Sequence, residues 1–134
     1  MIVVDTNVIC YRWMSSPNSA AAETALAKDP YWIVPLLWRS EFRNIAALAI
    51  RKKALTINAA REIVRRAEAS FEHSEFAVSS DVVLQLVATS KCTAYDCEFV
   101  ALADEERVQF VTADRQILQE FPEVAISLDK FVRR

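Results

Sequence analysis

The sequence predicts an α/β fold with three layers (α/β/α), in which helices cover both faces of a parallel sheet of roughly five strands. Short apolar segments alternate with longer helical segments along the whole chain. Strands that are separated by helices pair in parallel through right-handed crossovers. No internal repeat, low-complexity stretch or linker breaks the alternation, and 134 residues is close to the usual size of one domain. We therefore expect a single domain over residues 1–134.

Two strands and four helices are expected in the first half of the chain. The strands are residues 2–4 and 31–34, because both segments are apolar and rich in β-branched or aromatic side chains. Helices are expected at residues 7–14, at residues 20–28 with Ser19 as the cap, from Pro35 to about Lys53, and at residues 57–70 after Thr56.

Three further strands are expected in the second half, at residues 76–78, 109–112 and 124–126. The helices between them are residues 81–89 with Ser80 as the cap, residues 94–106 with Thr93 as the cap, residues 114–120 closed by Pro122, and a last turn at residues 128–132.

The composition is that of an ordinary globular protein, with 53% hydrophobic and 25% charged residues. A net charge of −2 and a pI near 5.5 exclude a uniformly basic surface for nucleic acid. Any contact with RNA must then be local, and the alternative for each basic run is a solvated helix face. The candidates are Arg39, Arg43, Arg51, Lys52, Lys53, Arg61, Arg65, Arg66, Lys130, Arg133 and Arg134.

Neither a membrane span nor a basic leader is apparent, since the apolar runs are short and the chain opens directly into Ile2. We expect a cytoplasmic protein. Its three cysteines, Cys10, Cys92 and Cys97, have no metal-type spacing and are expected to be buried free thiols, against a zinc site or a nucleophile. The single histidine, His73, is expected in a solvated loop. Trp13, Met14 and Trp32 belong either to a self-association surface or to the core.

Four acidic residues are candidates for chemistry. Asp5 and Asp114 follow predicted strands, so topology delivers them to the carboxyl edge of the sheet, although both also suit turns or helix caps. Asp96 lies three residues after Thr93, close to a capping box. Glu41 interrupts the apolar face of the long helix, and a salt bridge to Arg39 or Arg43 is the alternative to a functional role.

These acids point to a divalent ion because four ionised carboxylates at one place repel one another strongly. A set of oxygen ligands without histidine or cysteine suits Mg²⁺ or Mn²⁺ better than zinc. The chain contains no glycine, and loops that cradle nucleotide phosphates need it. The sequence therefore predicts a metal-dependent enzyme that acts on a phosphodiester, and we expect a ribonuclease.

Four stretches of the sequence resemble the acidic motifs of PIN-domain ribonucleases of the VapC type, which are toxins of toxin–antitoxin pairs. The resemblance runs from Met1 to about Phe121. The stretches are Ile2-Val3-Val4-Asp5-Thr6-Asn7, Trp38-Arg39-Ser40-Glu41-Phe42, Thr93-Ala94-Tyr95-Asp96 with Val100-Ala101-Leu102-Ala103, and Phe110-Val111-Thr112-Ala113-Asp114.

The resemblance implies Mg²⁺ or Mn²⁺ at Asp5, Glu41, Asp96 and Asp114, with Thr6, Asn7 and Thr112 holding the acids or metal waters. It also implies cleavage of RNA, a homodimer and inhibition by a small antitoxin. Two departures stand out. Gln116 replaces an acid found in many relatives, which weakens a second metal site, and residues 106–108 lack the usual glycine for an αL turn.

Other functions remain open at this stage. A PIN-like fold without catalysis would act as a binding or regulatory module. A phosphatase of the haloacid-dehalogenase type needs an acid where the chain has Asn7, and a phospho-receiver domain needs an aspartate that Phe76-Ala77-Val78-Ser79 does not offer.

Overall fold

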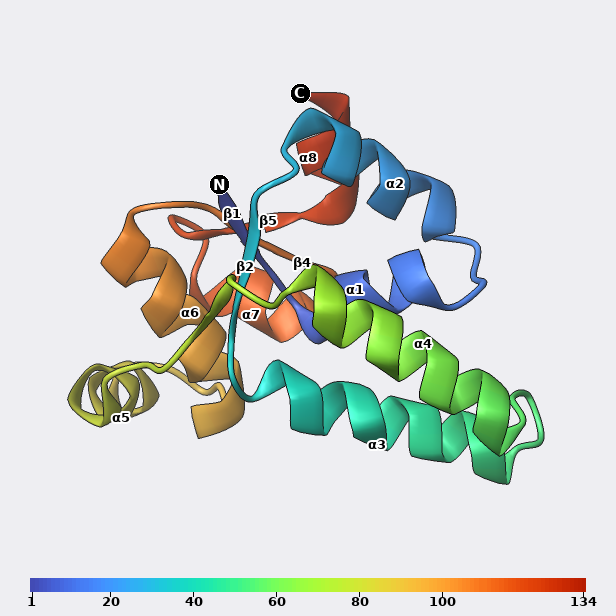
Figure 1. Ribbon diagram of the computed structural model, residues 1–134. Coiled ribbons are helices and arrows are strands. Elements are labelled where there is room, and N and C mark those ends of the chain that lie inside the picture. The colour runs from blue at the N-terminus through green and yellow to red at the C-terminus, as the bar shows by residue number, and fades with distance from the viewer.

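In the computed structural model, which describes residues 1–134, a parallel sheet of five strands lies between two groups of helices (Figure 1). The strand order is β3-β2-β1-β4-β5 and every pairing is parallel, so the expected fold class is confirmed. No helix has the length and apolar character needed to cross a membrane. The elements are β1 (Ile2–Val4), α1 (Thr6–Trp13), α2 (Ser19–Lys28), β2 (Trp32–Pro35), α3 (Trp38–Arg51), α4 (Ile57–Ser70), β3 (Glu75–Phe76), α5 (Ser80–Ala88), α6 (Ala94–Glu106), β4 (Phe110–Thr112), α7 (Arg115–Glu120), β5 (Ala125–Ser127) and α8 (Leu128–Arg133).

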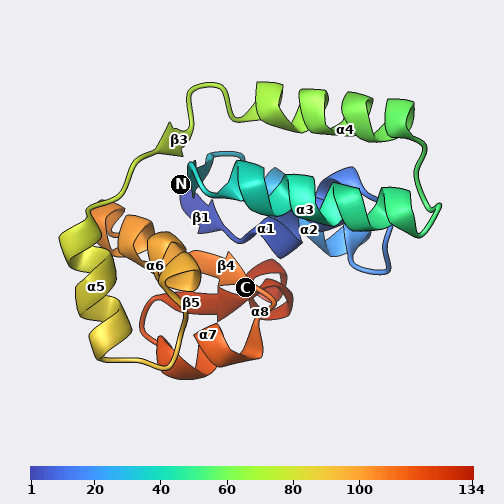
Figure 2. The same ribbon diagram turned by 90° about the horizontal axis from the view of Figure 1, so that it is seen from below.

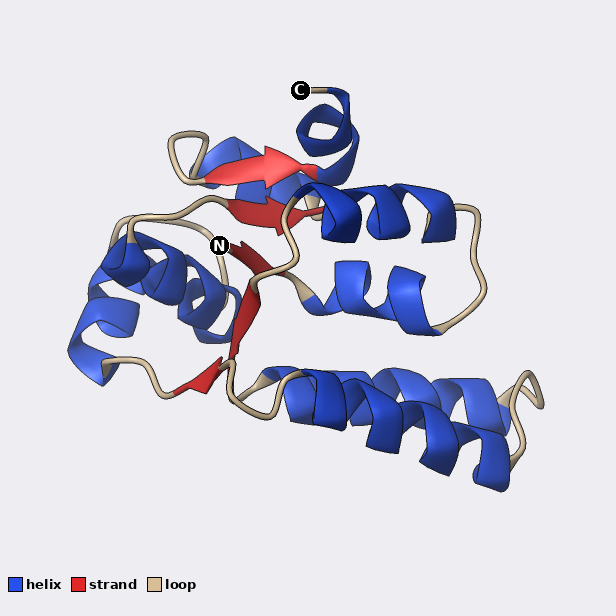
Figure 3. Cartoon of the chain, turned by 45° about the horizontal axis from the view of Figure 1, so that its top comes forward, coloured by secondary structure: helices blue, strands red, loops and turns tan.

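Strand β1 is the centre of the sheet. Its Val3 is fully buried and lies opposite Ile33 of β2 on one side and Phe110 of β4 on the other. Helices cover both faces of the sheet, with α5 and α6 on one side and α1 to α4 on the other (Figures 2 and 3). A strand that is covered on both faces must be apolar throughout, as Ile2–Val4 is. Asp5 is therefore the first polar residue after the central strand.

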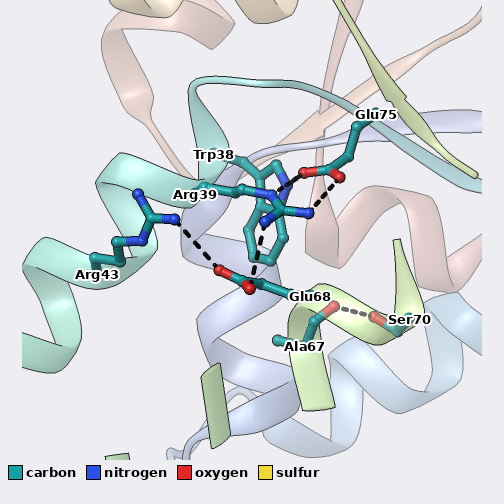
Figure 4. A network of polar contacts seen from close by, with 7 residues as sticks. All are labelled: Trp38, Arg39, Arg43, Ala67, Glu68, Ser70 and Glu75. Carbon is teal, nitrogen blue, oxygen red and sulfur yellow. Dashed lines mark hydrogen bonds and ion pairs between the residues drawn. The ribbon is translucent and has the colours of Figure 1, made fainter. Parts of the chain in front are cut away.

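Helices α3 and α4 form an antiparallel pair that extends beyond the sheet (Figure 1). A polar network joins the start of α3 to the end of α4 and to β3 (Figure 4). The buried Trp38 donates its indole N–H to Glu75 Oε2 at 2.7 Å, and Arg39 donates to both carboxylate oxygens of Glu75 at 2.6 and 2.8 Å. Arg39 and Arg43 also approach Glu68, at 3.3 and 3.6 Å. The network fixes where α3 begins.

The expected start of the long helix at Pro35 is wrong. Pro35 is buried in β2 opposite Phe76, and α3 begins only at Trp38. The missing N–H of the proline breaks no bond to β3, because Val34 N donates to Ser74 O at 3.0 Å and Leu36 N donates to Phe76 O at 3.1 Å. Proline often begins a helix, but here the pairing of β2 with β3 leaves its position without a hydrogen bond to donate, so the strand accommodates it.

Three smaller expectations are also corrected. Strand β3 is Glu75–Phe76 and not residues 76–78, since the last amide that reaches it, that of Leu36 directly after β2, donates to Phe76 O. Ser79, not Ser80, caps α5 by accepting a hydrogen bond from Val82 N at 3.4 Å. Ser19 is the first residue of α2, and its hydroxyl donates to Tyr11 O at 2.6 Å, which ties α2 to α1.

Helix α6 ends without glycine in a left-handed residue, as the sequence requires for the turn before β4. Arg107 has φ 56° and ψ 46°, and Val108 N donates to Ala103 O at 3.0 Å. A side chain with a Cβ atom is disfavoured in this conformation by about 1 kcal/mol. The turn is thus held by the packing of α6 and β4 on either side of it.

We predict that Arg107→Gly raises the free energy of unfolding by about 1 kcal/mol, because glycine adopts the left-handed conformation without steric cost. Urea unfolding followed by circular dichroism measures the change. Arg107→Ala is the control, since it keeps the Cβ atom and should bring no such gain. Equal effects of the two substitutions would contradict the prediction.

Candidate functional site

Asp5 is held at the carboxyl end of β1 by neutral donors. Its side chain caps α1, with Thr6 N donating to Oδ1 at 2.8 Å. Its other oxygen, Oδ2, accepts from the Thr112 hydroxyl at 2.6 Å and from Asn7 Nδ2 at 3.4 Å. The residue is only 9% exposed and forms no ion pair. The helix-cap alternative is therefore true, yet it leaves the negative charge without a cationic partner.

The electrostatics of Asp5 reflect that lack of compensation. Burial raises the pKa of its carboxyl to about 7, with the negative charges of Glu41 and Asp96 adding to the rise. The hydrogen bonds from Thr112 and Thr6 N act in the opposite direction but do not offset the burial. A buried carboxylate in this position costs folding free energy unless a cation or a proton neutralises it.

Glu41 lies in the first turn of α3 and points toward the same place. Its Oε1 accepts a hydrogen bond from the Thr6 hydroxyl at 2.7 Å. Burial raises its pKa, and the carboxylates of Asp96 and Glu98 raise it further. The alternative of a salt bridge to Arg39 or Arg43 is wrong, because both arginines are engaged by acids of α4 and β3 (Figure 4).

Asp96 and Asp114 complete the acidic side of the sheet edge. Asp96 stands in the first turn of α6, where its N–H donates to the Thr93 hydroxyl at 3.1 Å, and burial together with Asp114 raises its pKa. Asp114 caps α7, with Oδ1 accepting from Gln116 N at 2.8 Å and Ile117 N at 3.1 Å. Its own N–H donates to the Thr112 hydroxyl at 3.0 Å. Thr112, fully buried, thus joins Asp114 to Asp5.

The four acids act on one another electrostatically but are not packed into a ready ligand set. Asp5 is affected by Glu41 and Asp96, and Asp96 by Asp114. No three acidic, histidine or cysteine side chains are grouped as ligands for one ion. Carboxylates that repel one another are expected to stand apart without a cation between them.

The residues at this edge nevertheless fit a hard divalent ion. All the donors are oxygens, none of the four acids pairs with lysine or arginine, and the buried Asn7 Oδ1 has no hydrogen-bond partner. Oxygen donors of this kind are those that Mg²⁺ and Mn²⁺ prefer. Such an ion would supply the compensation that Asp5 lacks.

Sequence reasoning missed one acid near the site. Glu98 of α6 is half-buried, lies close enough to raise the pKa of Glu41, and has no hydrogen bond or ion pair within the chain. The signal was present, because Glu98 stands between Cys97 and Phe99, both buried.

The cysteines are free thiols, as expected, with Cys92 and Cys97 buried and Cys10 half-buried. Burial, with the added negative charge of Asp5 and Glu41, raises the pKa of Cys10 to about 12. Burial likewise raises the pKa of Cys92 to about 11. Thiols with such pKa values stay protonated at neutral pH, which is against a role as nucleophile or metal ligand.

Several surface expectations are also resolved. Trp32 is buried, so the core alternative holds for this side chain, whereas Trp13 and Met14 pack against the core and are only half-buried. His73 is exposed in a turn, as expected. Among the basic candidates, Arg65 pairs with Glu62 at 2.7 Å on the exposed face of α4.

Comparisons with known proteins agree with this fold. The sequence model of the PIN domain matches residues 2–125, whereas no curated protein matches the chain in sequence. The structure is similar to PAE2754 from Pyrobaculum aerophilum, with a TM-score of 0.78 and 19% identity over 99% of this chain and 94% of that one. It is also similar to FitAcB from Neisseria gonorrhoeae, with a TM-score of 0.76 and 18% identity over 96% and 98% of the two chains. A toxin-antitoxin complex from Klebsiella pneumoniae has a TM-score of 0.65 and 17% identity, again over 96% and 98%.

The raised pKa of Asp5 predicts a pH dependence of stability. Between its ordinary value of 3.8 and about 7, the folded carboxyl keeps a proton that the unfolded one has released. The free energy of unfolding in chelator should therefore fall as pH rises through this window, by on the order of 2–4 kcal/mol, and level off above it. Urea titrations across the window measure the fall.

Asp5→Asn should lose this part of the pH dependence and be more stable than the native chain near neutral pH. Asp104→Asn is the control. Asp104 is exposed on α6, so this variant should keep the pH dependence of the native chain. Parallel pH profiles for the native chain and Asp5→Asn would show that Asp5 is not the group responsible.

Proposed function

The chain belongs to the PIN-domain family, and we propose that it is a metal-dependent endoribonuclease. PIN domains are generally nucleases. The observation that carries the proposal for this chain is the buried, uncompensated carboxylate of Asp5 beside Glu41 and Asp96. An acidic site of this kind attracts a divalent cation and, once neutralised, accommodates the anionic phosphodiester of RNA.

In this proposal Asp5, Glu41, Asp96 and Asp114 hold Mg²⁺ or Mn²⁺. A divalent ion supplies Lewis-acid chemistry, because it polarises the phosphodiester and lowers the pKa of a bound water. The acids themselves position the site: Asp5 is fixed by the end of β1, Asp114 by the end of β4, and Glu41 and Asp96 by the first turns of α3 and α6. These four elements meet at the carboxyl edge of the sheet.

Neutral side chains support the acids without cancelling their charge. Thr6 donates its hydroxyl to Glu41 and its N–H to Asp5, so one residue orients two acids. The Thr112 hydroxyl donates to Asp5 and accepts from the backbone N–H of Asp114, so it links these two residues. Asn7 donates to Asp5, and its buried carbonyl oxygen has no partner in the chain, so it would be free to accept a hydrogen bond from a water at the site.

Gln116 bears on the number of ions. It occupies the place where many relatives carry a further acid, and it is exposed, with its backbone N–H engaged by Asp114. Neutral Gln116 adds no charge to hold a second dication. We therefore propose one ion held by the four acids.

The biological role that we propose is that of a toxin. One structure similar to this chain is described as a toxin-antitoxin complex, and the match covers 96% of this chain. The expected partners are RNA as substrate, a second copy of the chain in a homodimer, and a small inhibitory antitoxin, all in the cytoplasm. Coexpression with the product of an adjacent small reading frame should relieve growth arrest if the antitoxin is encoded there.

The first prediction of this proposal concerns the acids. Asp96→Asn and Asp5→Asn should each lower metal-dependent RNA cleavage by more than about 100-fold, because each removes a charged ligand. Cleavage of a mixed RNA pool in Mg²⁺ or Mn²⁺, with and without chelator, measures this. Asp104→Asn on the exposed side of α6 should cleave normally. A folded native chain that cuts no RNA in either metal would favour the alternative of a binding module.

The second prediction concerns Thr112. Thr112→Val keeps the shape of the buried side chain but removes the hydroxyl that joins Asp5 and Asp114, so metal affinity should fall by about 10–100-fold. Thr112→Ser keeps the hydroxyl and should bind nearly as the native chain does. Titration with Mn²⁺, followed calorimetrically, separates the two variants, and equal affinities would refute the role.

A further inference from the structure

A cavity of about 440 Å³ opens between the end of β3, α5 and α6. Leu36, directly after β2, and Phe76, the last residue of β3, form one wall. Val83 and Leu84 of α5 form another, and Glu98 of α6 contributes the one charged side chain. Nothing in the acidic site described above uses this cavity.

Glu98 of α6 links the cavity to the acidic site, because it lines the cavity and also raises the pKa of Glu41. Glu98 lies two residues after Asp96 and close to Glu41, so one helix presents an acid to each place. Leu36 follows β2, which is next to β1 in the sheet, and Phe76 ends β3, which pairs with the other side of β2. Figure 1 shows α5 and the first turns of α6 and α3 along this lower edge of the molecule. The one charged residue of the cavity therefore lies near an acid of the proposed site.

The walls of the cavity carry apolar surface that folding leaves uncovered. Leu36 is 54% exposed, Leu84 is 64% exposed and Phe76 is 36% exposed, whereas most aromatic side chains of the chain are buried in the core. An exposed phenylalanine beside aliphatic side chains is a surface on which an unpaired base stacks. Proteins that read RNA in single-stranded form use aromatic side chains in this way.

Glu98 decides which chemical groups the cavity accepts. Its carboxylate is half-buried among apolar side chains and has no donor from the protein. An ionised carboxylate only accepts hydrogen bonds, so it excludes a phosphate and selects a ligand with N–H groups. Two adjacent N–H donors match its two oxygens best. Among the four RNA bases, guanine presents such a pair on its Watson–Crick edge, at N1 and N2.

We propose that this cavity binds a guanine base of the RNA substrate, next to the phosphodiester held at the acids. The base stacks on Phe76, and Glu98 accepts hydrogen bonds from its N1–H and N2–H groups. The proposal rests on the proposed ribonuclease function and gives it a base preference. Glu98 is then a specificity residue, distinct from the acids that hold the ion.

Binding of short oligouridines that carry one guanosine, one inosine or one adenosine tests the proposal. The full-length Asp5→Asn variant in Mg²⁺ serves for this, since it should not cut the RNA, and fluorescence anisotropy reports the affinity. Guanosine should bind about tenfold more tightly than inosine, which lacks the N2 amino group, and than adenosine. Equal affinities for the three oligonucleotides would overturn the proposal.

Substitution of Glu98 gives the second arm. Glu98→Gln, introduced into the same Asp5→Asn chain, presents one donor and one acceptor, so the preference for guanosine over adenosine should disappear. Glu105→Gln, at an exposed position near the end of α6, is the matched control and should keep the preference. Phe76→Leu preserves an apolar wall without stacking and should weaken binding of all three oligonucleotides by about tenfold. Unchanged preference in Glu98→Gln, or unchanged affinity in Phe76→Leu, would contradict the assignment.

The sites of cleavage distinguish failure of this inference from failure of the proposed function. If the native chain cleaves RNA, the cuts should lie beside guanosine. The Glu98→Gln variant, with Asp5 intact, should cleave RNA without this preference. Cleavage without any preference for guanosine removes the base site and leaves the ribonuclease. Selective binding of the guanosine oligonucleotide without cleavage removes the ribonuclease and leaves the base site.

Discussion

The burial of the Asp5 carboxylate without a cationic partner is the constraint on which the rest of the site depends. Its position is dictated by the sheet, because β1 is paired on both sides and the chain can turn polar only where the strand ends. Thr6 and Thr112 supply hydrogen bonds but no positive charge, so the carboxyl keeps a pKa raised by burial. A residue that destabilises the fold in this way is typical of a functional site.

The arginines of α3 form ion pairs away from the acidic site, so the negative charges at the sheet edge have no cationic partner. Arg39 lies only two residues from Glu41, yet its guanidinium turns toward Glu75 and Glu68, and Arg43 also approaches Glu68 (Figure 4). These contacts anchor α3 to α4 and to β3. The same helix therefore carries one acid toward the sheet edge and directs its arginines away from it, which keeps the edge available for a free cation.

Much of the fold could be predicted from local sequence, because strong signals agreed with the tertiary structure. Ile2–Val4 is a strand too apolar for anything but the centre of the sheet, and Thr93 and Thr56 begin helices where their hydroxyls cap them. The prediction that Pro35 begins a helix was wrong, because the place of Pro35 in β2 depends on which amides face β3. The double role of Thr112 and the exposure of Glu98 to a cavity depend on distances between segments far apart in the sequence, which no local pattern contains.

Diffraction from crystals soaked in Mn²⁺ tests the central claim most directly, since the anomalous signal locates the ion independently of any activity. The account predicts one strong peak at the carboxyl edge of the sheet, with oxygens of Asp5 and at least one of Glu41, Asp96 and Asp114 among its ligands. No peak at that edge in a crystal that takes up Mn²⁺ elsewhere, or a lysine or arginine side chain occupying the place instead, would contradict it.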